Sequence, residues 1–359
     1  MRMVAVKTLS VALVVGAQVF VGADTFTDGA DRLLAMQNND GGWDWALTNG
    51  NPDTGSAPNT AGPIGMGLLA AYEATGVAEY LGAAVDAGDF IVSGAPPYAV
   101  SDGVFLAALS DLTGDAGYAD AVRTDYYGAL AAGTYDLDAT HTDYDVGELA
   151  SAILAAYTPS GQVNKAAWNI ALAAVGAQRL GVDTTAWAAA LETAVNAMTA
   201  GAYYDVLGLA GSVWALSELG VDIDPTSGAF ASASSTAELA ATLAGWQIDG
   251  GFAWRSDSLT AGVGNETVQE TAYALLALRS FDDTLYAGAI AAAEDYLVGA
   301  QLATGGWDHW WPAGENNEIT GEALWALRAP VDPVPEPATV LLLGLGLAGV
   351  ALRRTRRTF

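Results

Sequence analysis

The sequence predicts an all-α protein built as an array of helix pairs. Alanine is abundant between residues 24 and 330, and apolar residues recur there at three- and four-residue spacing in one run after another. Gly, Pro, Asp and Asn cluster between these runs, as turns require, and strand-like alternation is nearly absent. Three of the runs end in the same Gln-containing Gly-Gly-aromatic sequence, which indicates an internal repeat.

The spacing of apolar residues, with the turn residues between runs, sets the approximate bounds of each helix. The predicted helices cover residues 28–37, 60–75, 78–93, 102–113, 116–131, 146–157, 164–180, 184–198, 206–219, 236–247, 268–280, 285–301 and 318–328.

The repeated turn joins each helix to a polar loop and then to an alanine-rich helix. Its three copies run from Gln37 to Trp43, from Gln247 to Phe252 and from Gln301 to Trp307. We expect the Gln and the aromatic residue of each copy to brace neighbouring repeats. Tyr144-Asp145 and Tyr204-Asp205 open two further helices that we expect to be of the same inner kind. A repeat that cannot bury its own apolar face must stack on its neighbours.

This turn, followed by Gln269-Glu270-Thr271-Ala272-Tyr273-Ala274-Leu275-Leu276-Ala277-Leu278, resembles the repeat of squalene-hopene cyclases and of protein prenyltransferase β subunits. The resemblance covers most of residues 28–330 and is weakest in the middle. It implies an α/α toroid of about six helix pairs, with an outer ring of helices around an inner ring. An architecture of this kind does not define an activity.

This chain lacks the residues that the best-known activities of this fold require. Cyclases of the resembling family protonate an alkene with an Asp-x-Asp-Asp motif, and the nearest sequences, at 136–139, 143–146 and 222–225, lack the fourth aspartate. Prenyltransferases and thioester-bearing relatives need a cysteine, and the chain has none. Terpenoid cyclisation is therefore a remote alternative.

Carboxylates at the starts of inner helices are the candidate catalytic residues. Glu270, Glu322 and Asp145 are the three that we select for a polysaccharide hydrolase or lyase, which needs two acids flanking the scissile bond. The alternative for each acid is helix capping, since 145–148, 267–270 and 235–238 fit capping boxes or close variants. Asp143, Glu148, Glu266 and Glu318 are further acids of this kind.

Aromatic residues in the loops that follow the repeated turns are the candidate ligand-binding residues. Trp45, Trp254, Trp310 and Trp311 lie outside the bracing pattern, and loops on a rigid scaffold commonly carry binding sites. The alternative is that these tryptophans pack within the fold and contact no ligand. His309 stands among the tryptophans and titrates near neutral pH. The loops at 43–60, 252–267 and 307–318 are expected to converge on one face.

No cofactor is predicted. Residues 136–145 form an acidic loop that includes His141 and offers oxygens to Ca²⁺, but it lacks the glycine and terminal glutamate of an EF-hand loop. The alternative is a solvated acidic loop.

The charge of the region between the two ends is extreme. It holds seven basic and 39 acidic residues, a net charge of about −32. Such a field excludes nucleic acid as a partner and disfavours highly anionic polysaccharide. It suits a protein in salty water. With no cysteine, packing alone must hold the fold.

Salt is expected to stabilise the protein, because it screens repulsion among these acids. The thermal midpoint should rise between low salt and about 1 M NaCl, where the screening length is only about 3 Å. A flat or falling midpoint would contradict this expectation.

The C-terminus contains three sequence elements in a defined order. Pro335-Glu336-Pro337 precedes an apolar segment at 338–352 and a basic cluster that starts at Arg353 and Arg354. These ordered elements resemble the PEP-CTERM sorting tail, which implies transient membrane anchoring and cleavage by exosortase near Pro-Glu-Pro. An ordinary C-terminal membrane anchor is the alternative. The apolar segment is short for a span, and its arginines favour a cytoplasmic end.

The N-terminus has the features of a secretory signal peptide. Arg2 and Lys7 precede an apolar stretch from Leu9 to Val21, and small residues precede Asp24. An uncleaved membrane anchor is the alternative. The predicted organisation is a signal peptide at 1–23, an α/α toroid at 24–330 and a sorting tail at 331–359.

Together these features predict an exported protein destined for the cell surface or extracellular matrix. Exosortase and the inner membrane are its expected partners during sorting, and extracellular polysaccharide is a candidate ligand. The toroid is expected to bind a ligand such as a glycan or to serve a structural role, with polysaccharide hydrolysis or elimination as the alternative.

Overall fold

The computed structural model describes residues 22–44, 56–94, 98–137, 143–261, 265–308 and 314–328. The chain divides into two compact units, Met1–Leu327 and Arg328–Phe359, and every described helix and strand lies in the first. The α-helices are α1 (Ala23–Met36), α2 (Ala61–Thr75), α3 (Ala78–Ser93), α4 (Asp102–Thr113), α5 (Ala116–Val122), α6 (Ala129–Ala132), α7 (Val146–Tyr157), α8 (Val163–Arg179), α9 (Thr185–Ala197), α10 (Asp205–Leu219), α11 (Thr236–Ala244), α12 (Val268–Asp282), α13 (Ala287–Gly299) and α14 (Asn317–Leu327).

Three shorter helical segments complete the set. η1 (Arg123–Gly128) is a π-helix between α5 and α6, whereas η2 (Gly228–Phe230) and η3 (Ser256–Ala261) are 3₁₀ turns. The described helices match the predicted ranges closely, apart from α1, which begins five residues before its predicted start. The described residues are therefore mostly helical, as predicted.

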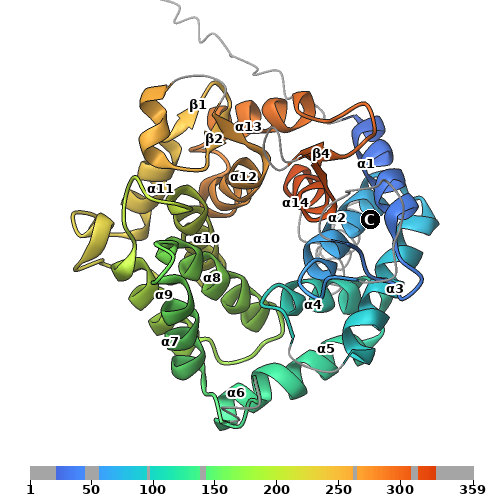
Figure 1. Ribbon diagram of the computed structural model, residues 1–359, viewed down its shortest axis with the longest axis horizontal. Helices are drawn as coiled ribbons and strands as arrows, with labels where there is room; N and C mark the ends of the chain where they lie inside the picture. Colours follow the sequence, from blue (N-terminus) through green and yellow to red (C-terminus); the bar gives the residue numbers. More distant parts are fainter. Residues whose placement is uncertain are drawn as a thin grey trace, which may run out of the picture. The chain divides into compact units, whose positions relative to one another are not determined.

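Six helices form a closed inner ring within this unit (Figure 1). Going round it, α2 packs on α4, α4 on α8, α8 on α10, α10 on α12, α12 on α14, and α14 returns to α2. These helices are buried along most of their length because each packs between two ring neighbours and against helices outside the ring. Most of their residues are accordingly small or apolar, and the helices are not amphipathic.

The remaining helices lie outside this ring and bury a single stripe each (Figure 1). One prediction was wrong here. Asp145 opens α7, which packs on α8 and α9 and buries only Val146, Leu149 and Ala150. Its turn resembles that of the inner helix α10, but only α10 has apolar residues on all sides.

The bracing role of the repeated turn is confirmed. Gln37 Nε2 donates to the carbonyl oxygen of Gly41 in its own turn, at 2.9 Å, and to that of Ala83 on α3, at 2.9 Å. The other two glutamines do the same: Gln247 reaches Ala289 on α13, and Gln301 reaches Thr25 on α1. Each glutamine thus bonds one outer helix to the next.

The aromatic residue of each turn packs in the core beneath that turn. Trp43 and Trp307 are fully buried, and each indole donates to a backbone carbonyl ten residues earlier, at 2.8 and 2.7 Å. The first Gly of the pair is required by the backbone. Gly305 has φ 93°, and a Cβ there would lie 2.2 Å from the carbonyl oxygen of Asp28.

Glycine also allows α14 to close the ring on α2. A Cβ on Gly321 would lie 2.5 Å from the Cα of Ile64, and a Cβ on Gly67 would lie 2.5 Å from the carbonyl oxygen of Gly321. The two helix backbones therefore approach each other directly, with no side chain between them.

Short strands are the main feature that the sequence did not predict. β1 (Gln247–Ile248), β2 (Gly251–Ala253) and β3 (Glu266–Thr267) form one antiparallel sheet, and β4 (Trp307–Asp308) pairs with β5 (Glu315–Asn316). Segments of two or three residues are too short to show alternation. They anchor the loops that lead into α12 and α14.

The apolar segment at 338–352 and residues 1–21 lie outside the described residues. Among the described helices, none has both the length and the hydrophobicity that a membrane crossing needs.

Candidate functional site

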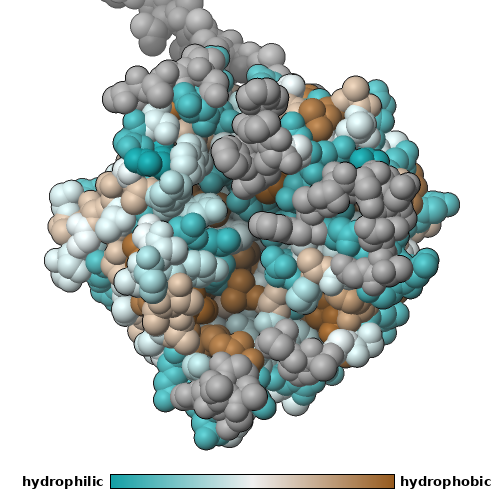
Figure 2. Space-filling model, in the orientation of Figure 1, coloured by the Kyte–Doolittle hydropathy of each residue, from teal (hydrophilic) through white to brown (hydrophobic). Residues whose placement is uncertain are grey.

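The N-terminal turns of α8, α10, α12 and α14 lie together and carry the most unusual side chains of the ring. We call them the acidic mouth, and they comprise residues 164–168, 204–205, 269–273 and 317–322. Contacts across helices hold them together: Asn164 bonds the loop before α10, and Gln269 on α12 bonds Glu322 on α14. Figure 2 shows the unit hollowed near the centre of the ring, with hydrophobic residues at the base of the hollow.

Glu322 is a buried acid that receives three hydrogen bonds from α12. Gln269 Nε2 donates to both carboxyl oxygens, at 3.2 and 3.0 Å, and Tyr273 Oη donates to one of them, at 3.0 Å. Glu318 lies one turn earlier on the same helix and is also buried. Burial, and next the charge of Glu318, raise the pKa of Glu322 well above its usual range. The hydrogen bonds from Gln269 and Tyr273 oppose this rise.

Glu270 occupies a different environment on the neighbouring helix. Its side chain is 1% exposed and accepts a hydrogen bond from the Thr267 hydroxyl. Burial raises the pKa of Glu270, and the Thr267 hydroxyl and the charge of Lys165 oppose that rise. Thr267 makes no side-chain cap on α12, so residues 267–270 do not form a complete capping box.

Four aromatic rings from successive inner helices pack beside these acids. Tyr273 contacts Trp168 edge to face, with centroids 5.4 Å apart, and also meets Trp214 and Trp325 at 6.4 and 6.2 Å. All four rings are buried. This part of the ring interior is therefore filled by aromatic side chains rather than by water.

Lys165 is the one lysine among the described residues, and it stands inside an aromatic cage. Its Nζ lies 5.8 Å from the ring centroid of Tyr157, 5.7 Å from that of Trp168 and 5.3 Å from that of Tyr204. The electron-rich faces of three rings stabilise the cation. Tyr204 reaches this position with φ 61°, a left-handed conformation that is rare for a bulky residue and marks a constrained site.

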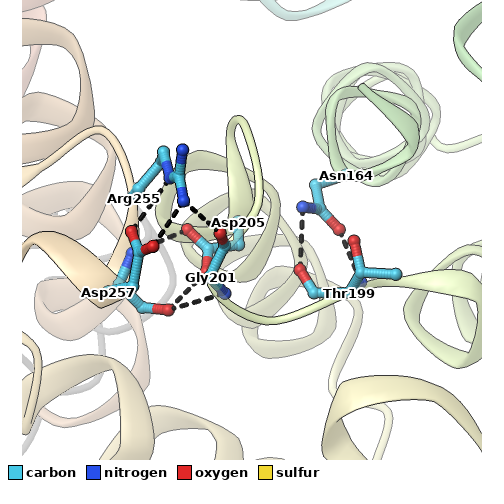
Figure 3. A network of polar contacts seen from close by, with 7 residues as sticks. Asn164, Thr199, Gly201, Asp205, Arg255 and Asp257 are labelled. Atoms are coloured by element: carbon cyan, nitrogen blue, oxygen red, sulfur yellow. Dashed lines mark hydrogen bonds and ion pairs between the residues drawn. The ribbon is translucent and has the colours of Figure 1, made fainter. Parts of the chain in front are cut away.

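The loop before α10 is locked by the polar network in Figure 3. Asn164 Nδ2 donates to the carbonyl oxygens of Thr199 and Tyr203, at 3.0 and 2.9 Å, and Asn164 Oδ1 accepts from Thr199 N, at 2.8 Å. One asparagine on α8 therefore holds both ends of a turn that it does not belong to.

Asp205 fastens the same loop to the segment after β2. Its buried carboxylate accepts hydrogen bonds from Gly201 N, at 2.7 Å, from Ser256 N, at 2.9 Å, and from the Ser256 hydroxyl. Arg255 donates to the carbonyl oxygen of Gly201, at 2.7 Å, and pairs with Asp257 (Figure 3). Burial raises the pKa of Asp205, and these hydrogen bonds oppose the rise.

The segment after β2, which Asp205 fastens to this loop, presents Trp254, one of the predicted ligand-binding residues. Trp254 packs edge to face on Tyr203, with centroids 4.9 Å apart, and the Arg255 guanidinium lies over both rings, at 5.6 and 5.7 Å. Tyr203 is 44% exposed, one of few large apolar side chains so exposed. The pair is an accessible aromatic surface on a rigid support.

The structure does not unite all the predicted site residues. Asp145 lies apart on α7, where it is exposed and forms a complete capping box with Glu148. The structure therefore shows Asp145 as a helix-capping residue, which was the alternative to a catalytic role. Ser235 and Glu238 form a similar cap on α11, in which Glu238 accepts from Ser234 N. Trp45, His309, Trp310 and Trp311 lie outside the described residues, as does His141.

The described residues contain no group of three or more His, Cys, Asp or Glu side chains placed to hold a metal ion. Of the acidic loop at 136–145, residues 138–142 lie outside the described part.

Sequence reasoning missed Lys165 and its cage, and also the role of Asp205. Both residues depend on partners from distant segments: Lys165 lies against Tyr157 and Tyr204, and Asp205 accepts from Ser256. Lys165 had one signal: it is the single lysine between the two chain ends.

The PEP-CTERM protein-sorting motif matches residues 333–357. A tail of this kind implies export, membrane anchoring before cleavage, and recognition by exosortase. No curated protein matches the chain.

Solved structures match the helical unit. A protein from Actinoplanes is 21% identical over 85% of this chain and 98% of its own, with a TM-score of 0.50. A possible member of the GH105 family from Klebsiella pneumoniae is 13% identical over 90% and 98%, with a TM-score of 0.56. Another, from Salmonella enterica serovar Paratyphi A, is 14% identical over 90% and 98%, with a TM-score of 0.53. These likenesses support the helical toroid, and they do not single out the cyclase or prenyltransferase branch.

Proposed function

We propose that this protein is exported, sorted by its C-terminal motif, and binds a carbohydrate on the aromatic surface beside the acidic mouth. The observation that carries the proposal is the pairing of Tyr203 with Trp254, two partly exposed rings on two segments, before α10 and after β2, that Asp205 holds together. Sugar rings present C–H faces that pack on aromatic planes. A rigid support lowers the entropy lost on binding.

Polar groups near this surface suit the hydroxyls of a sugar. Lys165 lies in its cage and makes no hydrogen bond or ion pair with any described residue, so its N–H groups are available to a ligand. Tyr204 is fixed on the same loop as Tyr203, and burial, followed by the charge of Glu270, raises the pKa of Tyr204. Apolar rings with a few fixed polar groups are what small-ligand sites present.

Glycan-array binding of the fluorescently labelled protein tests this proposal. We expect binding to at least one family of polysaccharide fragments, and at least a tenfold loss of affinity when Tyr203 and Trp254 are both changed to alanine. The matched control is Phe281→Ala with Tyr286→Ala, a partly buried aromatic pair at the other end of α12, with centroids 6.2 Å apart. Equal losses in both double variants, or no bound glycan at all, would overturn the proposal.

A second candidate function is hydrolysis or elimination of the bound glycan by Glu270 and Glu322. The observation that favours it is the contrast between the two acids. Burial raises the pKa of both acids. At Glu322 the charge of Glu318 adds to the rise, whereas at Glu270 the Thr267 hydroxyl and the charge of Lys165 oppose it. Paired acids with separated pKa values can serve as proton donor and base.

Release of reducing sugar, or of an unsaturated product absorbing in the ultraviolet, separates this candidate from binding alone. Changing Glu322→Gln keeps the shape and one accepting oxygen but removes the titratable proton, so turnover should fall by at least 100-fold while binding persists. A glycan that is bound but never cleaved leaves the binding function and eliminates the enzyme.

Processing at both ends is expected in the exported protein. The mature chain should lack residues 1–23 and the segment after about Pro337, because a signal peptidase and exosortase would act there. Intact-mass spectrometry of protein recovered from the cell surface gives the result directly. A mass that corresponds to Met1–Phe359 would contradict the expectation.

A further inference from the structure

The aromatic cage around Lys165 adjoins the proposed carbohydrate surface through consecutive residues of one loop. Tyr203 is 44% exposed, whereas its neighbour Tyr204 is half-buried, with its ring centroid 5.3 Å from Lys165 Nζ. Consecutive Cα atoms are about 3.8 Å apart. A glycan that packs on Tyr203 therefore lies close to the cage.

Each ring of the cage is fixed by a separate feature of the fold. Tyr157 Oη accepts a hydrogen bond from Asn169 Nδ2, at 2.9 Å. Trp168 packs edge to face on Tyr273, with centroids 5.4 Å apart. Tyr204 is held in a left-handed backbone conformation, with φ 61°. The cage is therefore formed before a ligand arrives, which lowers the entropy lost on binding.

Lys165 brings unused hydrogen-bond donors to this cage. An ammonium group has three N–H donors and no acceptor. Its Nζ lies 5.3, 5.7 and 5.8 Å from the three ring centroids, near the outer limit of about 6 Å for a cation–π contact. The rings hold the ammonium in place but supply no strong acceptor. The side chain is only half-buried, and no ion pair joins it to another described residue.

The charges around the cage disfavour an anionic ligand group. The acidic mouth contains one base, Lys165, and four acids: Asp205, Glu270, Glu318 and Glu322. The charges of Lys165 and Asp205 act on Glu270 in opposite directions, so the lysine already offsets these acids. A ligand carboxylate or sulfate would add a further negative charge, whereas a neutral acceptor would not.

A neutral group with a strong acceptor and an apolar end suits these features. The carbonyl oxygen of an acetyl group accepts N–H bonds, and its methyl group packs on aromatic faces. A sugar hydroxyl has no apolar end. The ammonium of a free amino sugar would be repelled by Lys165.

We infer that this aromatic cage binds the acetyl group of an acetylated sugar, with Lys165 Nζ donating to the acetyl oxygen. The inference rests on the proposed carbohydrate binding and names the class of sugar that is bound. Nitrogen carries the acetyl group in an N-acetylated amino sugar, and oxygen carries it in a sugar ester. Both present the same carbonyl oxygen and methyl group.

Calorimetric titration of the full chain with matched oligosaccharides tests the inference. Hexamers of N-acetylglucosamine, glucose and glucosamine with the same linkage differ in one substituent on each sugar. O-acetylated xylohexaose and its deacetylated form supply the ester arm. We expect binding at least about tenfold tighter for an acetylated hexamer than for its unacetylated counterpart, as a hydrogen bond to a charged donor provides. The arm that shows this preference identifies the atom that carries the acetyl group.

Matched variants locate the preference. Lys165→Met keeps an unbranched apolar side chain and removes the N–H donors, so the two affinities should come within about twofold of each other. Arg179→Met is the control, since it removes the same charge from the same helix. Arg179 lies over a different ring, with its guanidinium 5.9 Å from the centroid of Trp214. This control should retain the full preference, and an equal loss in both variants would overturn the inference.

Saturation-transfer NMR gives a second readout on the unchanged protein, should Lys165→Met fail to fold. The acetyl methyl protons should receive the strongest saturation of any ligand protons and shift upfield, because aromatic faces shield the protons above them. Stronger saturation of the sugar-ring protons than of the methyl protons would contradict the inference.

The outcomes separate this inference from the carbohydrate function on which it rests. Equal affinity for acetylated and unacetylated hexamers would overturn the inference and leave carbohydrate binding intact. Tighter binding of an anionic galacturonate hexamer would do the same. If none of these hexamers binds, the inference is overturned, and the carbohydrate function is overturned with it only when the glycan array also shows no binding.

Discussion

The free energy of unfolding is expected to be larger at pH 5 than at pH 7.5, by about 3 kcal/mol from Asp102 alone. Burial raises the pKa of this acid to about 7, whereas an unfolded aspartate has a pKa near 3.8. Between these values the folded state binds more protons than the unfolded state. Stability therefore falls as the pH rises through this window and levels off above about pH 7.

Other buried acids also make the free energy of unfolding larger at pH 5 than at pH 7.5. Burial is the first cause of the raised pKa of Glu270, Glu322 and Asp205. Acidification also reduces the net charge of −28 and the repulsion that accompanies it. Urea unfolding at fixed ionic strength measures the effect.

Asp102→Asn separates one acid from the rest. Its free energy of unfolding should change less between pH 5 and pH 7.5 than that of the unchanged protein, by about 3 kcal/mol. Asp183→Asn is the control, because Asp183 lies at the surface and its lowered pKa falls below this window. Higher stability at pH 7.5 than at pH 5 would contradict the burial of these acids.

Gly321→Val is expected to destabilise the protein by about 3 kcal/mol or more, because it forces apart the two helices that close the ring. The atoms in the way are backbone atoms of α2: the Cα of Ile64 at 2.5 Å, its N at 2.8 Å and the carbonyl oxygen of Pro63 at 2.8 Å. Backbone cannot rotate aside as a side chain can.

Gly288→Ala is the matched control for this substitution. Gly288 lies in α13, and nothing lies within 4 Å of a Cβ at that position. Alanine there should stabilise the protein by up to about 1 kcal/mol, since glycine is the weaker helix former. If Gly321→Val unfolds at the same urea concentration as the unchanged protein, α14 does not close on α2 as described.

Much of the architecture was predictable because the repeat is written in local sequence. Helix bounds follow from apolar spacing and turn residues, and the bracing role of Gln37 and Gln301 follows from their place in the repeated turn. Inner and outer helices were harder to separate. Asp145 and Asp205 open helices with the same dipeptide pattern, yet only the second lies in the inner ring.

The candidate site was only partly predictable because its contacts join distant segments. Glu270 and Glu322 were selected from their helix positions, and both are buried at the acidic mouth. The cage of Lys165 depends on rings from α7, α8 and α10, and Tyr204 reaches it through a left-handed backbone. No local pattern marks such an arrangement.

Covalent footprinting, read by mass spectrometry, tests carbohydrate binding at the Tyr203–Trp254 pair most directly. The full chain is labelled with and without the glycan that binds best on the array. We predict protection of peptides that contain 199–205 and 252–257, with no change at 281–286. Unchanged labelling at Tyr203 and Trp254 under saturating glycan, or protection confined to another surface, would contradict the account.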